Sequence, residues 1–401
     1  METMDFGKES LALHAANRGK WEVRNRIPLN THLDLSLAYT PGVAAVSSEI
    51  AAHPEKVWEL TPRGNTVAVV SNGTAVLGLG DIGSQGAIPV MEGKSILFKQ
   101  FADIDAVPIV TDLRDPQDLI RFVRAIAPSF GGLNLEDITA PECFQVEQAL
   151  QDLGIPVFHD DQHGTAIVLL AGLINAARAT GRKMTELNVV INGAGAAGSA
   201  IARLLRCVGH DPTICEPVKS LIICDSKGII AAGRKDLNRE KEALLSFSNR
   251  ENMTGTIHDA LRGADVFIGV SKGNLLTEED IRRMAPNPII FPMANPVPEI
   301  MPEVALKAGA AVVGTGRSDY PNQVNNLLVF PGIFRGALDA GAAVITPGMK
   351  IAAAHALARY MANPTPDNIL PDALDSRVAP LVAAAVKLRA ISEGVANTRK
   401  N

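Results

Sequence analysis

Two stretches of the chain have the spacing of a dinucleotide-binding glycine loop. They are Gly78–Gly83 (GLGDIG) and Gly193–Gly198 (GAGAAG). Such a loop constrains the fold, because it needs a buried strand before it and a helix after it. Backbone N–H groups at the N-terminus of that helix then face the pyrophosphate. The context of each loop therefore indicates which half of the chain holds a nucleotide.

The second loop has this context. The apolar run Leu187–Asn192 predicts a strand, and residues 196–208 predict a helix with apolar residues at i, i+3, i+4 and i+7. Another apolar run ends at Asp225, where a carboxylate suits a ribose hydroxyl pair. The separation from Gly198 is 225 − 198 = 27 residues, and a Pro-containing insertion at 210–220 explains why it exceeds the usual value of about 20. The expected cofactor-binding residues here are Gly193, Gly195, Ala196, Ala197, Gly198 and Asp225.

The first loop has part of the context. Thr74–Leu77 predicts a strand, and Asp103 lies about twenty residues further on. Pro89 and Gly93, however, interrupt the helix that should follow. We therefore expect the first loop to be a tight turn at a strand end that can still shape the active site.

The bulk properties predict an ordinary water-soluble protein. The chain has 401 residues, of which 47% are hydrophobic and 20% charged, enough for two domains. A net charge of −5 argues against nucleic acid or an anionic membrane as partner. No apolar run of membrane-spanning length and no signal peptide is found, so we expect a cytoplasmic protein. The four cysteines form no CxxC pair and are expected to be reduced: Cys143, Cys207, Cys215 and Cys224.

Strand-like and helix-like segments alternate along the chain, which predicts an α/β fold with parallel sheet. Strands are expected near 67–79 and 107–111, helices near 116–127, 142–152 and 165–179, and a helical tail at 347–397. We expect an N-terminal substrate and metal domain, residues 1–155. A Rossmann-like, doubly wound dinucleotide-binding domain with C-terminal helices should follow at residues 156–401.

Two polar clusters follow apolar sequence. They are Glu136-Asp137 and His159–His163 (HDDQH). Carboxylates at strand ends are costly to bury unless a positive charge holds them, and Mg²⁺ or Mn²⁺ with oxygen ligands would supply that charge. Alternatively they cap helices, since Asp161 precedes a helix expected to start near Thr165. Spacing alone leaves both interpretations open. Zinc fits less well, because the HExxH pattern is absent and no cysteine is near.

Taken in order, these segments resemble a compact bacterial malic enzyme. The resemblance runs from about residue 20 to residue 340. The matching motifs are AYTPGV (38–43), GLGDIG (78–83), IPVMEGK (88–94), LEDI (135–138), FHDDQHGTA (158–166), NGAGAAG (192–198), MANP (293–296) and NNLLVFPG (325–332).

The resemblance implies oxidation and decarboxylation of L-malate to pyruvate and CO₂ with NAD or NADP and a divalent metal. By position, Lys94 resembles the general base and Tyr39 the general acid. Glu136, Asp137 and Asp161 resemble the metal ligands. Asn295 and Asn326 resemble the substrate-holding residues, and Asn295 also lies at the cofactor. Burial or a nearby cation would have to lower the pKa of Lys94 for it to act as base near neutral pH.

The chain also departs from the family pattern. Residues 72–76 (NGTAV) offer no arginine where larger members bind a substrate carboxylate, and at Asn401 the chain stops without the phosphotransacetylase-like extension of longer bacterial relatives. Asp225 would repel a 2′-phosphate and favours NAD⁺, whereas Lys227 and Lys219 could reach such a phosphate. The family suggests a homodimer or a larger homo-oligomer.

Three other functions remain open on sequence grounds. A malolactic enzyme uses a similar scaffold and releases lactate without net reduction of the nicotinamide. A catalytically idle nucleotide sensor is a second alternative, although Tyr39, Lys94 and the three expected metal ligands are all present. An amino-acid dehydrogenase is weaker, because it needs no metal.

Overall fold

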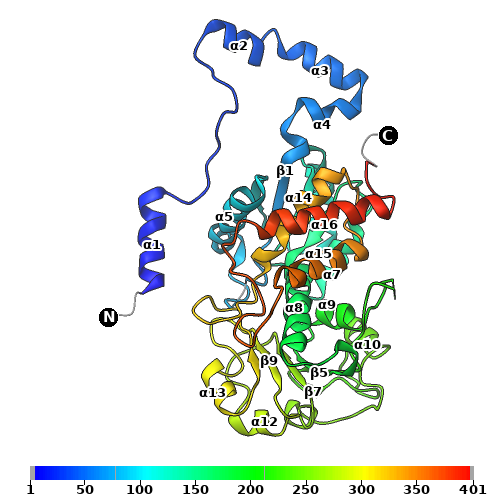
Figure 1. The fold of residues 1–401 in the computed structure, drawn as a ribbon. Helices are drawn as coiled ribbons and strands as arrows, with labels where there is room; N and C mark the ends of the chain where they lie inside the picture. The colour runs from blue at the N-terminus through cyan, green and yellow to red at the C-terminus, as the bar shows by residue number, and fades with distance from the viewer. Residues whose placement is uncertain (1–4, 77, 212, 398–401) are drawn as a thin grey trace.

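The computed structural model describes residues 5–76, 78–211 and 213–397. Two parallel sheets follow one another along the chain, and a helical arm precedes them (Figure 1). Among the described residues, no helix is both long enough and apolar enough to cross a membrane.

The first sheet has four parallel strands in the order β2-β1-β3-β4. The strands are β1 (Thr66–Ser71), β2 (Asp105–Val110), β3 (Gly132–Leu135) and β4 (Val157–His159), and the helices between them are α5 (Gly83–Ala102), α6 (Pro116–Ile126) and α7 (Glu142–Ala149). Alternate residues of β1 face opposite sides of the sheet. Val67 and Val69 pack with α5, whereas Ala68 and Val70 pack with α6 and α7.

The second sheet has the order β10-β9-β8-β5-β6-β7. Its elements are β5 (Asn188–Asn192), α9 (Ala196–Leu205), β6 (Ser220–Asp225), β7 (Gly228–Ile229), α10 (Arg239–Leu244), α11 (Ile257–Ala260), β8 (Val266–Gly269), α12 (Glu278–Arg282), β9 (Ile289–Pro292), α13 (Pro302–Lys307) and β10 (Val312–Val313). All pairings are parallel except that of β6 with β7. The strand order reverses between β5 and β8, as in a doubly wound nucleotide-binding sheet. The predicted fold class is confirmed.

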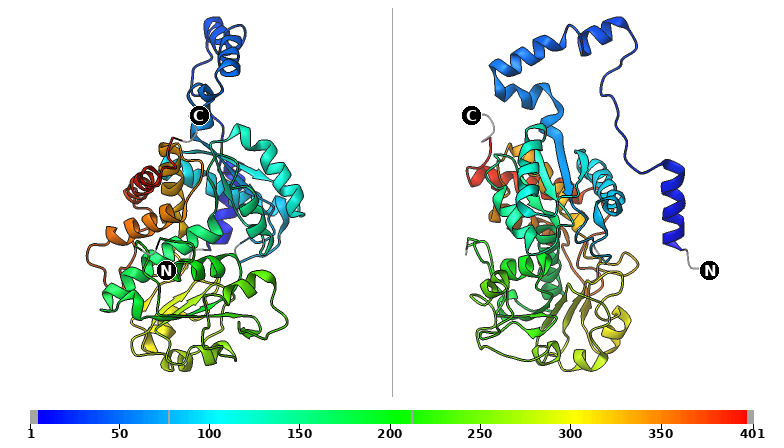
Figure 2. Two further views of the ribbon diagram at one scale, coloured as in Figure 1. Left: turned by 90° about the vertical axis from the view of Figure 1, so that its right-hand side faces the viewer. Right: turned by 180° about the vertical axis from the view of Figure 1, so that it is seen from behind.

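One hydrophobic core joins the two sheets. Helix α8 (Asp160–Ala179) leaves the first sheet and enters the second, and Val67 and Ile191 belong to the same buried cluster. The chain then returns through α14 (Phe330–Ala340), α15 (Pro347–Tyr360) and α16 (Val378–Ser392) to lie beside the first sheet (Figure 2). Strand β4 pairs with β3, so residues 157–159 complete the first sheet. The expected division at residue 155 stays a prediction.

The N-terminal arm lies away from this body in Figure 1 and in the right-hand view of Figure 2. It comprises α1 (Phe6–Asn17), α2 (His32–Ala38) and α3 (Val43–Ala52), and α4 (Val57–Leu60) connects it to β1. Helices α1, α2 and α3 contain no buried residue. Its contacts with the body are made by the linking segment, where Lys20 N donates to Glu92 Oε2 and Trp21 Nε1 donates to Ala106 O.

The prediction that Pro89 and Gly93 interrupt the helix after the first glycine loop was wrong. Helix α5 runs unbroken from Gly83 through both residues to Ala102. A proline inside a helix costs about 3 kcal/mol. The buried face formed by Met91, Phe98 and their neighbours offsets that cost, because most helix stability in proteins comes from tertiary packing.

Two predicted boundaries were also wrong. The strand expected to continue to residue 79 ends at Ser71, because Gly73 turns the chain with a φ of +67°. The end of the strand expected at Thr74–Leu77 lies outside the described residues. The helix expected to begin near Thr165 begins at Asp160, so Asp161 lies in its first turn.

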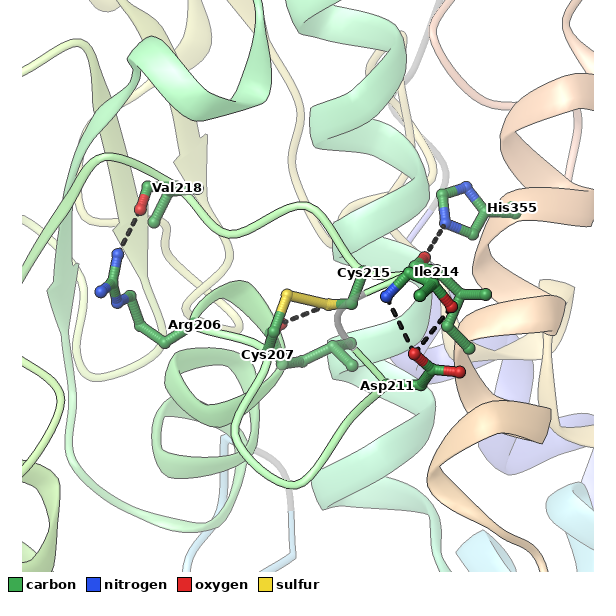
Figure 3. Close-up of a disulfide and its surroundings, with 9 residues drawn as sticks. Arg206, Cys207, Asp211, Ile214, Cys215, Val218 and His355 are labelled. Atoms are coloured by element: carbon green, nitrogen blue, oxygen red, sulfur yellow. Dashed lines mark hydrogen bonds between the residues drawn. A yellow bond between two sulfur atoms is a disulfide. The ribbon is translucent and has the colours of Figure 1, made fainter.

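The prediction of four reduced cysteines was wrong. Cys207 and Cys215 form a disulfide, whereas Cys143 and Cys224 are free and buried (Figure 3). The disulfide joins Cys207, before the predicted insertion at 210–220, to Cys215 within it, so residues 207–215 form a closed loop. Residue 212 of this loop lies outside the described residues.

Candidate active site

A buried lysine lies among carboxylates at the carboxyl edge of the first sheet. Lys94 Nζ lies 2.8 Å from Glu136 Oε1 and 2.6 Å from Asp160 Oδ2. None of the three side chains is more than 8% exposed. Helix α5 presents Lys94 from its buried face, while Glu136 follows β3 and Asp160 follows β4. Parallel neighbouring strands end at the same edge, so the predicted position of these carboxylates is confirmed.

The other predicted metal ligands adjoin this cluster. Asp137 N donates to Asp161 Oδ2 over 2.8 Å, and Asp137 adopts a φ of +54°. A non-glycine residue in this left-handed region is uncommon and costs energy that the surroundings must supply. Asn326 Nδ2 donates to Asp160 Oδ2 over 2.5 Å. The fold thus brings together Lys94, Glu136, Asp137, Asp161 and Asn326, which the sequence had named.

The cluster holds more carboxyl groups than cations, and burial makes their ionised forms costly. Burial raises the pKa of Glu136 to about 7, although Lys94 acts in the opposite direction. Burial likewise raises the pKa of Asp160 to about 7 and of Asp161 to about 6. Burial alone would lower the pKa of Lys94, but Asp160 and Glu136 outweigh it and raise that pKa. The sequence-based expectation that the pKa of Lys94 is lowered is therefore not met: in this structure the two carboxylates raise it.

The carboxylate oxygens are ligand atoms that suit a hard divalent cation. Asp160 Oδ1 is buried and accepts no hydrogen bond from the described residues. Carboxylate oxygens are the ligands that Mg²⁺ and Mn²⁺ prefer. Within the described residues, however, no three acidic, histidine or cysteine side chains converge as a preformed ligand set. The oxygen ligands therefore fit a divalent metal, but the carboxylate side chains would have to rotate to bind it together.

Tyr39 does not reach Lys94 within one chain. It caps the C-terminus of α2 in the arm and is 67% exposed. The expectation that both residues meet in one site therefore fails for a single copy of the chain. Asn295 lies at the turn after β9 and is half-buried.

The first glycine loop packs against this turn. A Cβ on Gly78 would come 2.9 Å from Asn295 O, so the missing side chain lets the two segments meet. Glu299 also supports the turn, because its carboxylate accepts from Ala294 N and Ser271 N at 3.0 and 3.1 Å. A loop of the first sheet thus meets the end of the second.

The second glycine loop has the geometry of a pyrophosphate cradle. It connects β5 to α9, and Gly193 has a φ of +123°. A Cβ on Gly198 would come 1.7 Å from Gly193 O, so close helix packing requires glycine there. A Cβ on Gly195 would meet no described atom within 4 Å, which leaves space for a ligand at the helix N-terminus.

A cavity of about 740 Å³ adjoins this loop, the size expected for a small-molecule or cofactor site. Asp225 lies in its wall, where its carboxylate accepts from Arg234 Nη1 and Nη2 at 3.0 Å each and from Lys241 Nζ at 2.7 Å. Burial would raise the pKa of Asp225, but these cations outweigh it and lower the pKa. Lys227 also lines this cavity, and Lys219 lines a different one.

Three residues that contact the predicted site residues were not singled out from the sequence. Asp160 stood in the quoted cluster, but only its neighbour Asp161 was assigned a role. Arg234 and Lys241 lie 9 and 16 residues beyond Asp225, and no spacing rule connects them to it.

These features define an NAD(P)-binding α/β protein whose second sheet carries the nucleotide loop and whose first sheet carries a buried lysine–carboxylate site at its carboxyl edge. Comparison with known proteins defines the family. The model of the malic enzyme NAD-binding domain matches residues 162–391, and that of the malic enzyme N-terminal domain matches residues 18–121. The chain belongs to the malic enzyme family.

Individual relatives agree over nearly the whole chain. A bifunctional malic/malolactic enzyme of Bacillus subtilis is 51% identical, with 98% of this chain and 95% of the relative covered. An NAD-dependent malic enzyme of Geobacillus stearothermophilus is 50% identical, with 94% and 78% covered. The crystal structure of an NAD-dependent malic enzyme from Thermotoga maritima matches with a TM-score of 0.89 at 48% identity, covering 94% of this chain and 98% of that one. Further relatives are named NADP-dependent.

Proposed function

We propose that the chain oxidises and decarboxylates L-malate with NAD(P)⁺ as the hydride acceptor. The C2 hydroxyl loses its proton, C2 transfers hydride to the nicotinamide, and the bond to the C4 carboxylate breaks to release CO₂. The enolate that remains takes a proton at C3 and becomes pyruvate. The observation that carries this proposal is the buried Lys94–Glu136–Asp160 cluster at the carboxyl edge of the first sheet, which Asn326 contacts from the second half of the chain.

We assign the divalent cation, Mg²⁺ or Mn²⁺, to Glu136, Asp137 and Asp161. Two observations support this assignment. The cluster holds more carboxyl groups than cations, and Asp160 Oδ1 is buried without a hydrogen-bond partner among the described residues. When bound, such a cation polarises the substrate oxygens and stabilises the enolate as a Lewis acid.

Lys94 is proposed as the general base for the C2 hydroxyl. Asp160 and Glu136 hold Lys94 as an ammonium, so it must first lose its own proton before it can act as a base. Neutralising the surrounding negative charge would lower its pKa and favour that loss. Asp160 is proposed as a positioning residue, because it fixes Lys94 Nζ from one side while Asn326 fixes Asp160 from the other. Asn295 and Asn326 are proposed to hold the substrate, and Asn295 also to contact the cofactor.

Tyr39 is proposed as the acid that protonates C3, and a second copy of the chain is proposed to supply it. The arm that carries Tyr39 exposes many apolar side chains and buries none in α1, α2 or α3. Exposed apolar surface of this extent is typical of an association site. A homodimer in which each arm docks on the partner would cover these side chains and complete both sites.

We propose NAD⁺ as the preferred cofactor, because the Asp225 carboxylate lies in the nucleotide cavity where it suits ribose hydroxyls. Arg234 and Lys241 neutralise that carboxylate and could instead attract a 2′-phosphate. A cytoplasmic location also stays a prediction.

The test is an assay of the purified protein with L-malate, Mn²⁺ and either NAD⁺ or NADP⁺. Reduced nicotinamide and pyruvate formed in equal amounts, and lost when EDTA removes the metal, would support the proposal. A higher kcat/KM with NAD⁺ would support the cofactor assignment. No turnover despite tight nucleotide binding would instead favour the nucleotide sensor.

A malolactic reaction is the second candidate, because one close relative is named for both activities. The same assay separates the two reactions. Consumption of malate with lactate formed and no accumulated reduced nicotinamide would replace the first proposal with this one.

A further inference from the structure

A second cavity, distinct from the nucleotide cavity, is lined by basic and apolar side chains. Its volume is about 200 Å³, too small for a dinucleotide. Helices α7, α8, α9 and α15 and the disulfide loop form its walls. The titratable side chains in the wall are all basic, and among the described residues no carboxylate lines it: Arg203, His163, His210 and Lys350.

Two of these basic groups have no anionic partner. Among the described residues, neither Lys350 nor Arg203 makes a hydrogen bond or an ion pair through its side chain. Lys350 Nζ lies 5.8 Å from the centre of the Phe158 ring, and the Arg203 guanidinium lies 5.7 Å from that of Phe247. A partly buried cation without a partner is costly, so an anion in the cavity would stabilise both.

The nearest carboxylate is already engaged elsewhere. Glu147 lies behind the wall, where its Oε1 is 2.9 Å from His163 Nε2 and accepts from His159 N at 3.2 Å. Burial would raise the pKa of Glu147, but His163 outweighs it and the pKa falls to about 2. Glu147 is thus a carboxylate paired with His163. Its charge also acts on Lys350 and raises the pKa of that ammonium, but the two side chains form no direct ion pair in the described structure.

Two further polar atoms in the wall have unused hydrogen-bonding capacity. Gln162 Nε2 and His210 Nδ1 are both buried and have no hydrogen-bond partner in the described part of the chain. Buried polar groups are nearly always hydrogen-bonded, so an unpaired pair in one cavity wall points to a polar ligand. Burial lowers the pKa of Lys350 more than Glu147 raises it, and burial and then Lys350 lower that of His210, as expected for basic groups without a directly bonded counter-ion.

The rest of the wall is apolar apart from Ser199. Phe144, Ala166, Ile167, Ala200, Leu204 and Val208 contribute to it. An inorganic oxyanion has no hydrocarbon part and would leave these apolar side chains uncovered. A carboxylate with a short hydrocarbon chain presents one charged head and an apolar body, which matches the two kinds of wall.

We propose that this cavity binds a small aliphatic carboxylate, with the head group paired to Lys350 and the hydrocarbon chain packed between α8 and α9. The disulfide loop completes the wall, because Val208 and His210 lie between the two bonded cysteines. His355 of α15 contacts Ile214 O of this loop over 3.2 Å (Figure 3). The site is separate from the one proposed for malate, and its occupancy requires no turnover.

The experiment is calorimetric titration of the full-length protein with butyrate. Butanamide, which has the same body without the charge, serves as the control ligand. Lys350→Met removes the charge and keeps most of the chain length. Lys387→Met, on the exposed side of α16, is the matched control variant. We expect saturable butyrate binding in the wild type and in Lys387→Met, at least tenfold weaker binding in Lys350→Met, and none for butanamide.

Equal butyrate affinity in Lys350→Met and the wild type would overturn the proposal. So would butanamide binding as tightly as butyrate, sulfate binding in place of butyrate, or no saturable binding below about 10 mM. If Lys350→Met does not fold, as judged by circular dichroism, Arg203→Met takes its place with the same expected tenfold loss. A crystal soaked in butyrate gives a second measurement, in which density between Lys350 and α9 supports the site and an empty cavity contradicts it.

Discussion

At the scale of single residues, Lys94 is the group on which the proposed chemistry depends. Its ammonium lies between two buried carboxylates, a position that raises its pKa and keeps it charged in the absence of substrate and metal. The residue type and its place in IPVMEGK were visible in the sequence. The charge state was not, because it depends on Asp160, which is 66 residues away in the chain.

We expect Lys94→Met to lower kcat by about 10²–10⁴-fold, the usual contribution of a general acid–base group. Nucleotide affinity should stay within twofold of the wild type, because the cradle at Gly193–Gly198 lies on the other sheet. Steady-state kinetics and a nucleotide titration measure the two quantities, with the exposed Lys387→Met as control. Full activity in Lys94→Met would remove it from the mechanism.

The raised carboxylate pKa values predict how metal binding depends on pH. A cation must displace protons from two of its proposed ligands, Glu136 with a pKa of about 7 and Asp161 with a pKa of about 6. Between about pH 4 and 7, the folded protein binds more protons at these groups than the unfolded chain does. Without metal, their contribution to stability therefore falls as the pH rises through this range. Added Mn²⁺ should therefore raise the melting temperature more at pH 8 than at pH 5.5.

Thermal unfolding with and without Mn²⁺ at the two pH values measures this effect. Asp161→Asn is the matched variant, because it removes one proposed ligand and one titrating group at little change in size. The variant should show a smaller shift with Mn²⁺ at pH 8. A shift with Mn²⁺ that is equal at both pH values would place the cation elsewhere.

At the scale of helices and strands, sequence patterns located most elements and misjudged those that tertiary contacts decide. The strand–loop–helix unit at β5 and α9 followed from local periodicity alone. Helix α5 did not, because the packing of its buried face overrides Pro89 and Gly93. The insertion after α9 was recognised from its prolines, but the disulfide that closes it depends on how the loop folds back, which spacing does not determine.

The disulfide loop gives a prediction about stability. Cys207 and Cys215 are 8 residues apart, and closing a loop of that length stabilises the folded state by about 2.5 kcal/mol in the chain-entropy model. The double variant Cys207→Ser/Cys215→Ser should lose up to this amount in urea unfolding. Dithiothreitol should lower the stability of the wild type and leave the double variant unchanged. Wild-type stability that dithiothreitol does not alter would mean that the bond contributes nothing in solution.

At the scale of the whole molecule, the N-terminal arm is the feature that one copy of the chain does not explain. The motif AYTPGV was recognised in the sequence, and Tyr39 was assigned to the site on that basis. The structure instead separates Tyr39 from Lys94 and leaves the apolar residues of the arm exposed: Phe6, Leu11, Leu13, Val23, Ile27, Leu33, Leu35 and Leu37. Nothing local in the sequence distinguishes a helix that packs on its own body from one that packs on a second copy.

Mixing two inactive variants tests whether the partner supplies Tyr39. Tyr39→Phe lacks the acid and Lys94→Met lacks the base, so each homodimer should be inactive. In a mixed dimer, the arm of the Lys94→Met subunit would bring an intact Tyr39 to the intact Lys94 of the other subunit and so restore one of the two sites. Random pairing makes half of the dimers mixed, so co-expression should recover about a quarter of wild-type activity. If Tyr39 acts in its own subunit, every site keeps one defect and the mixture stays inactive.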